Sequence, residues 1–166
     1  MVGAARDPDV EGPVQAEIFV VWLDEEQKLE LTGPCAAAAW YVELGATDHP
    51  VEVVERVARH ALGKNPLLVH STSWRHDRDA VILSFVVVVD AADVGAMQSV
   101  TIGRAALARS EATAAPKEIA SAQVVEHGLR HLAWLVKDDP VVSHELSPAW
   151  KQALAGYVPE PFRNLG

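Results

Sequence analysis

The sequence predicts an α+β protein in which helices cover a mixed β-sheet. Residues 80–89 are almost all apolar and mostly β-branched or aromatic, as in a central strand with both faces buried. Residues 49–62 carry apolar side chains at three- and four-residue spacings, which is typical of an amphipathic helix. Strand patterns on both sides of this helix and helical patterns at the C-terminal end complete the α+β prediction.

Length and composition favour one domain. The chain has 166 residues, of which 49% are hydrophobic, and this is enough for one sizeable core. Residues 1–14 are polar and contain glycine and proline, so we expect a flexible leader. The domain is therefore predicted to span residues 15–166, with its helical part at about residues 117–157.

The charge and the cysteine content exclude several classes of partner. A formal net charge of −9 argues against binding to nucleic acid or to an anionic membrane surface. Cys35 is the only cysteine, which excludes an intrachain disulfide and a metal site rich in thiolates. The sequence contains neither a signal-peptide pattern nor an apolar run of membrane-spanning length, so we expect a cytoplasmic protein.

The first elements are predicted to be strands. Residues 15–23 read as a strand, residues 24–27 as an acidic turn and residues 28–31 as a short partner strand. Residues 38–44 combine alanines with aromatic residues and valine, and we interpret them as a further strand.

A helix and a hairpin follow. Asp48 or Thr47 is the expected N-cap of the helix over residues 49–62, and Gly63 is its expected stop. The hairpin consists of strands at residues 67–74 and 80–89, joined by a turn at residues 76–79.

The remainder of the chain is predicted to be mainly helical. Residues 91–115 are the least regular part, with a short strand predicted at 98–102. Two C-terminal helices follow, one over residues 117–137 and one beginning at Pro148 with Ser147 as its cap and Gly156 as its stop.

Residues 45–67 resemble the 23-residue box of the Nudix family of pyrophosphatases, G-x5-E-x7-R-E-U-x-E-E-x-G-U, where U is a bulky aliphatic residue. Gly45 falls on the first glycine, Arg59 on the arginine, Ala61 near the first aliphatic position and Leu67 on the last. The strands before and after these residues are also similar to the family's order. The resemblance implies a Nudix-like α/β/α sandwich over about residues 15–105, with two further C-terminal helices.

The box glutamates are absent from this sequence. Their positions are occupied by Val51, His60, Gly63 and Lys64. In the family these carboxylates hold the magnesium ion that polarises the pyrophosphate, and such a hard cation needs oxygen ligands. The resemblance therefore implies a degenerate active site that does not hydrolyse its substrate by the family's mechanism, and no catalytic residue is assigned.

A ligand-binding site is predicted on the first strand of the hairpin. His70, Trp74 and Arg75 combine an imidazole, a large aromatic ring and a guanidinium next to an apolar strand. Arg75 is of the type that binds phosphate or carboxylate groups. We expect a small-molecule ligand here.

A metal site is predicted on the long C-terminal helix. His127 and His131 lie four residues apart and Trp134 three further on, so all three share one stripe between the apolar and charged faces. A histidine pair at this spacing can chelate zinc or another transition metal. His70, His76 and Glu126 are candidate further ligands.

These patterns favour a ligand-binding or protein-interaction module. The alternative is a divergent metal-dependent phosphohydrolase with carboxylates supplied from elsewhere. A homodimer is the third hypothesis, because the valine-rich sheet and the aromatic C-terminal helices can leave an apolar patch. The sequence names no cofactor.

Overall fold

The computed structural model describes residues 12–34, 39–106 and 119–159. Its strands are β1 (Val14–Leu23), β2 (Leu29–Thr32), β3 (Trp40–Leu44), β4 (Leu68–Asp77), β5 (Ala80–Val88) and β6 (Ser99–Thr101). Its helices are α1 (Pro50–Leu62), α2 (Ala91–Val94), α3 (Ser121–Asp138), α4 (Pro140–Glu145) and α5 (Pro148–Leu154).

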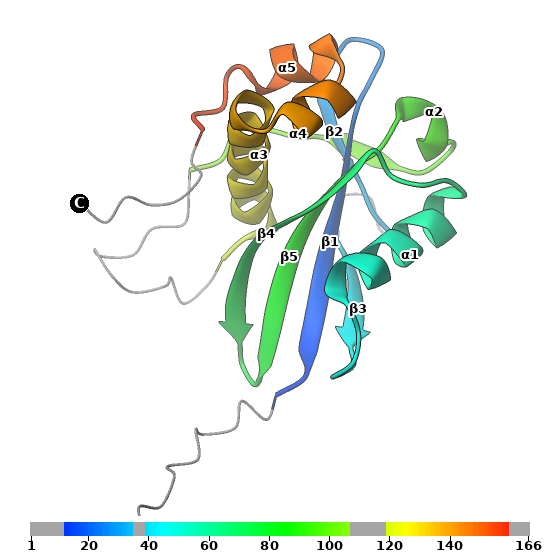
Figure 1. Cartoon of the computed structure of the whole chain (residues 1–166), viewed down its shortest axis with the longest axis vertical. Coiled ribbons are helices and arrows are strands. Elements are labelled where there is room, and N and C mark those ends of the chain that lie inside the picture. The colour runs from blue at the N-terminus through cyan, green and yellow to red at the C-terminus, as the bar shows by residue number, and fades with distance from the viewer. Residues whose placement is uncertain (1–11, 35–38, 107–118, 160–166) are drawn as a thin grey trace, which may run out of the picture.

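The strands form one mixed sheet (Figure 1). Its order is β4-β5-β1-β2-β6, and β3 pairs with the first half of β1 beside the stretch that pairs with β2. β1 runs parallel to β5, whereas the other pairs are antiparallel. The predicted α+β class is confirmed, and β5 is an interior strand as expected.

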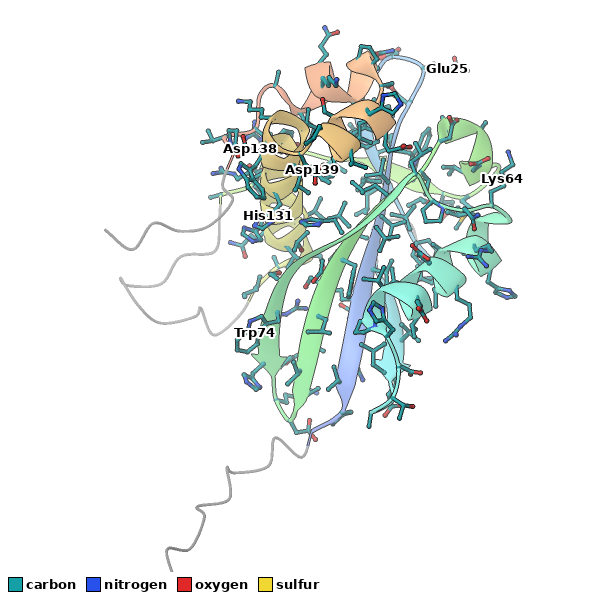
Figure 2. All side chains as sticks on the ribbon, viewed as in Figure 1. Glu25, Lys64, Trp74, His131, Asp138 and Asp139 are labelled. Carbon is teal, nitrogen blue, oxygen red and sulfur yellow. The ribbon has the colours of Figure 1, made fainter. Side chains whose placement is uncertain are left out.

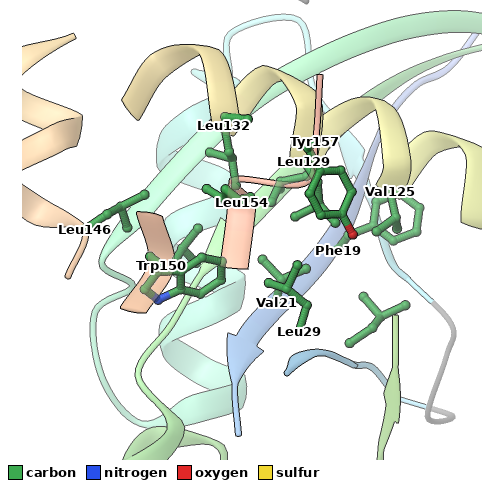
Figure 3. Close-up of a cluster of buried hydrophobic side chains, with 14 of the residues drawn as sticks. Phe19, Val21, Leu29, Val125, Leu129, Leu132, Leu146, Trp150, Leu154 and Tyr157 are labelled. Atoms are coloured by element: carbon green, nitrogen blue, oxygen red, sulfur yellow. The ribbon is translucent and has the colours of Figure 1, made fainter. Parts of the chain in front are cut away.

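Helices cover both faces of this sheet. One face packs Phe19, Val21, Val86 and Val88 against the three C-terminal helices, and it also buries Trp150 of α5 and Tyr157, which follows α5 (Figure 3). The other face carries a second apolar cluster that includes the buried side of α1. The result is an α/β/α arrangement in which the buried residues of the central strands face one helical layer or the other.

Local sequence signals explain the bounds of α1. Pro50 stands in the first turn, where a missing N–H costs nothing, and His49 is the N-cap in place of the expected Asp48 or Thr47. Gly63 ends the helix with a φ of 77°, a left-handed conformation that glycine adopts without strain. The predicted stop is confirmed.

Gly128 sets the distance between α3 and the sheet. A Cβ atom at this position would lie 2.4 Å from Cγ2 of Val86 and 3.3 Å from Cγ2 of Thr72. Only a glycine therefore lets the helix axis come this close to β4 and β5. This contact fixes which side chains of α3 face those of β4.

Several predicted boundaries need correction. The hairpin turn contains only Arg78 and Asp79, because β4 continues to Asp77. A third C-terminal helix, α4, was not predicted: its six residues are too few to show a periodicity, and Pro140 begins this helix as well as following α3. Within the described residues α3 begins at Ser121.

The other predicted elements are close to their expected positions. The strand predicted at 98–102 is β6, and the short strand predicted at 28–31 is β2. At the C-terminal end, Trp150, Leu154 and Tyr157 are buried. Most of the predicted leader and Cys35 lie outside the described residues. None of the described helices is long and apolar enough to cross a membrane.

Candidate functional site

The three predicted ligand-binding residues lie on β4 but do not share one face of the sheet. A β-bulge between Ser71 and Ser73 shifts the alternation of side chains along the strand. His70, opposite Val86, and Arg75, opposite Ile82, therefore both face the α3 layer. Trp74 is paired with Leu83, which packs on the α1 side of the sheet. The three side chains consequently do not converge on one pocket.

Arg75 is bound to a buried carboxylate within the sheet. Its Nη1 donates to Oε2 of Glu17 at 2.6 Å and its Nη2 donates to Oε1 at 2.9 Å, so the pair is bidentate. Ser84 Oγ donates to Oε2 of Glu17 at 3.0 Å, and the hydroxyl of Tyr41 donates to Oε1 at 2.5 Å. Four strands thus contribute one residue each to a network around Glu17.

This network keeps Glu17 ionised. Burial alone would raise the pKa of the carboxyl group, but hydrogen bonds from Arg75 and Tyr41 and the charge of Arg75 outweigh it and lower the pKa. The Glu17 side chain is only 1% exposed. Arg75 is therefore used for an internal ion pair, which leaves the predicted ligand site without its anion-binding group.

A histidine cluster joins β4 to α3. Nε2 of His70 lies 3.3 Å from Nδ1 of His131, and the ring centroids of His131 and His127 are 4.8 Å apart. Trp134 meets the His131 ring edge to face at 6.5 Å. Burial lowers the pKa of His70. Figure 2 shows His131 on the length of α3 that runs beside β4.

Of the three candidate further ligands, only His70 joins this cluster. His76 lies on the other face of the sheet, where its ring meets Trp74 at 5.5 Å. Glu126 is committed to two arginines: Nη2 of Arg104 and Nε of Arg130 both lie 2.9 Å from its Oε1. In the described part of the chain, no group of three or more His, Cys, Asp or Glu is arranged to hold a metal ion.

Glu126, a candidate metal ligand by sequence, is part of a buried ion-pair network. Its side chain is fully buried. Burial favours the neutral acid, yet hydrogen bonds from Arg104, Arg130 and the backbone of Ala105 lower the pKa. Arg104 also stacks on the ring of Tyr157 at 4.1 Å. Glu126 therefore joins α3 to the segments that follow β6 and α5.

The positions of the Nudix box glutamates show no carboxylate cluster on α1. His60 is exposed, and Nζ of Lys64 pairs with Asp93 of α2 at 2.6 Å. Arg59 donates from Nε to Oδ1 of Asn65 at 2.6 Å. Lys64 and Arg59 therefore make contacts near the C-terminal end of α1.

Trp74 is a large hydrophobic side chain of this region that is open to solvent. Its side chain is 67% exposed and lies at the margin of the sheet (Figure 2). β4 is the first strand in the sheet order, so no described strand pairs with its outer side. An exposed tryptophan on an edge strand is typical of a site for another chain.

Sequence reasoning missed both buried carboxylates. Glu17 stands within an apolar strand, between Ala16 and Ile18, and that position was the available signal. Glu126 stands three residues before the buried Leu129 and four before Arg130, a spacing that also indicates a shielded ion pair.

The fold and these sites define the chain as an α+β protein with helices on both faces of a mixed sheet and with two internal carboxylate–arginine networks. In comparisons with known proteins, no family model and no curated protein matches the sequence.

Proposed function

We propose that this protein is a binding module of Nudix-like architecture that recognises an extended segment of a partner protein along the outer edge of β4. The observation that carries the proposal is the exposed Trp74 side chain on this edge strand. The bound segment would add a strand to the sheet and place an apolar side chain against the indole ring.

The backbone of β4 provides the main recognition element. The strand is ten residues long, and its outer backbone N–H and C=O groups face away from β5. Proteins commonly protect such edges with lysine, proline or a bulge. β4 contains neither lysine nor proline, and its one bulge leaves residues 73–77 in regular pairing with β5.

The side chains near Trp74 suit a peptide that is uncharged or that carries charges of both signs. His76 packs against the indole ring on the same face, and Leu83 of β5 lies beside Trp74. The charge of Arg75 is already balanced by Glu17. An apolar anchor residue therefore suits this edge better than a phosphate group does.

The Nudix-like part of the proposal rests on the order of the elements. The residues similar to the box form a loop, the helix α1 and a second loop, between β3 and β4. The missing glutamates support a binding role over catalysis, because no magnesium ligands stand at their positions. We also propose that the protein acts in the cytoplasm.

A display library of short peptides, panned on the tag-free protein, tests the proposal. We expect selected peptides to bind the wild type and to lose at least about tenfold in affinity for Trp74→Ala. Val141→Ala is the matched control, because Val141 is also 67% exposed but lies on α4. Equal binding to both variants would contradict the assignment of Trp74.

Backbone recognition has its own test. Methylating alternate backbone nitrogens of a selected peptide removes the N–H donors that pair with a strand edge, while its side chains remain. Methylation of the edge-facing set should abolish binding, and methylation of the opposite set should not. If both sets bind equally well, the peptide is not an added strand.

Two other outcomes would replace the proposal. Light scattering that finds a dimer disrupted by Trp74→Ala would identify the occupant of the edge as a second copy of this chain, which is the homo-oligomer hypothesis. Magnesium-dependent turnover in a panel of nucleotide sugars and dinucleotides would favour the divergent phosphohydrolase and with it a small-molecule substrate.

A further inference from the structure

We propose that His70 and His131 bind one divalent transition-metal ion, such as Zn²⁺ or Ni²⁺, across the contact between β4 and α3. This site is independent of the peptide edge, because the His70 side chain faces the α3 layer and Trp74 faces the α1 layer. It differs from the site predicted within the helix, since its two ligands come from different elements.

The separation of the two nitrogens is that of a metal chelate. Nε2 of His70 and Nδ1 of His131 are 3.3 Å apart. Two imidazole nitrogens on a tetrahedral zinc ion, with bonds of roughly 2.0–2.1 Å, are separated by about 3.3 Å. The same distance permits a hydrogen bond when one ring carries the proton. On metal binding the ion would take the place of that proton, which would move to the other nitrogen of the same ring, so both rings stay neutral.

The scaffold holds both rings in place before an ion arrives. Gly128 sits between His127 and His131 in sequence and brings α3 into close contact with Val86 and Thr72. Register pairs His70 with Val86, so this ligand lies at the level of that close contact. Trp134 packs against the His131 ring. Little conformational freedom is then lost when the ion binds.

The ligand chemistry selects the class of ion. Imidazole suits zinc, nickel and copper, whereas magnesium and calcium prefer oxygen donors. With two protein ligands, water would complete the coordination shell.

Isothermal titration of the tag-free, chelator-treated protein at pH 7.5 tests the site. We expect one binding site for Zn²⁺ and for Ni²⁺, and no binding of Mg²⁺. His70→Gln and His131→Gln should each weaken binding at least about tenfold. His144→Gln is the matched control, because His144 is exposed on α4.

Two results would overturn the inference. One is the absence of Zn²⁺ and Ni²⁺ binding by the wild type. The other is binding that is lost in His127→Gln but unchanged in His70→Gln, which would place the ion on the helix pair alone.

A measurement on the wild type avoids any folding defect of the variants. Zn²⁺ should shift the ring resonances of His70 and His131 in NMR spectra and leave those of His144 unchanged. Unshifted His70 resonances at saturating Zn²⁺ would contradict the site.

Discussion

Arg75 and Glu17 form a bidentate ion pair across the sheet, with nitrogen–oxygen distances of 2.6 and 2.9 Å. One residue comes from the edge strand and the other from β1, with β5 between them. The pair therefore fixes the C-terminal half of β4, which carries Trp74, to the rest of the sheet.

Removal of the Arg75 guanidinium should lower the stability of the protein strongly. Arg75→Ala leaves the buried Glu17 carboxylate without its counter-charge, so we expect the free energy of unfolding to fall by about 3–5 kcal/mol. Urea unfolding at pH 7 measures this loss. Arg56→Ala, on the exposed side of α1, should change the value by less than about 0.5 kcal/mol. If Arg75→Ala and Arg56→Ala change the free energy of unfolding equally, the Arg75–Glu17 pair contributes little to stability.

Acid should destabilise the protein through both buried carboxylates. The folded-state pKa values of Glu17 and Glu126 lie below the usual 4.5, so the unfolded chain binds more protons in acid. Their contribution to stability is complete well above pH 4.5 and is lost as the pH falls through this value toward the folded pKa values. Urea midpoints between pH 7 and pH 3 should decline less steeply in Glu17→Gln than in the wild type. Parallel curves would contradict the lowered pKa of Glu17.

The two tyrosines should ionise at a higher pH than free tyrosine does. Burial and the neighbouring Glu17 carboxylate raise the pKa of Tyr41 to about 12, and burial raises the pKa of Tyr157. The sequence has only these two tyrosines, so the absorbance of tyrosinate reports on both. We expect little signal at pH 10, where a free tyrosine is about half ionised. If both tyrosines are half ionised at pH 10 in the folded protein, the raised pKa values of Tyr41 and Tyr157 are contradicted.

Gly128 should not tolerate a side chain. In Gly128→Ala the new Cβ would overlap Cγ2 of Val86, and we expect a loss of about 1–3 kcal/mol in the free energy of unfolding. Gly103→Ala is the control, since nothing lies within 4 Å of its added Cβ. The double variant Gly128→Ala, Val86→Ala should be less destabilised than the sum of its single changes, whereas simple additivity would mean that the overlap is not the cause.

Two tryptophans should differ in their effect on stability. Trp150 is 4% exposed and Trp74 is 67% exposed. Trp150→Ala should lower the free energy of unfolding by about 3–5 kcal/mol, and Trp74→Ala by less than about 0.5 kcal/mol. Thermal or urea unfolding compares them. A large loss in Trp74→Ala would indicate a structural role and would weaken the proposed binding site.

Periodicity predicted the elements whose side chains repeat regularly. The valine-rich β5 and the amphipathic α1 were identifiable because burial of one or both faces imposes a pattern on neighbouring residues. The six-residue α4 is too short for any such pattern.

The site depends on contacts that no local pattern contains. The bulge in β4 puts His70 and Arg75 on one face although they are five residues apart, and strict alternation would separate them. The partner of Arg75 lies 58 residues earlier in the sequence. Such pairings are determined by strand order and register, which the sequence does not reveal locally.

Hydrogen exchange with a selected peptide tests the central proposal most directly. If the peptide adds a strand to the sheet, the amides of residues 73–77 that face away from β5 should exchange more slowly in the complex, and those already paired with β5 should change little. Unchanged exchange along β4, with protection elsewhere in the chain, would show that the partner binds at another surface.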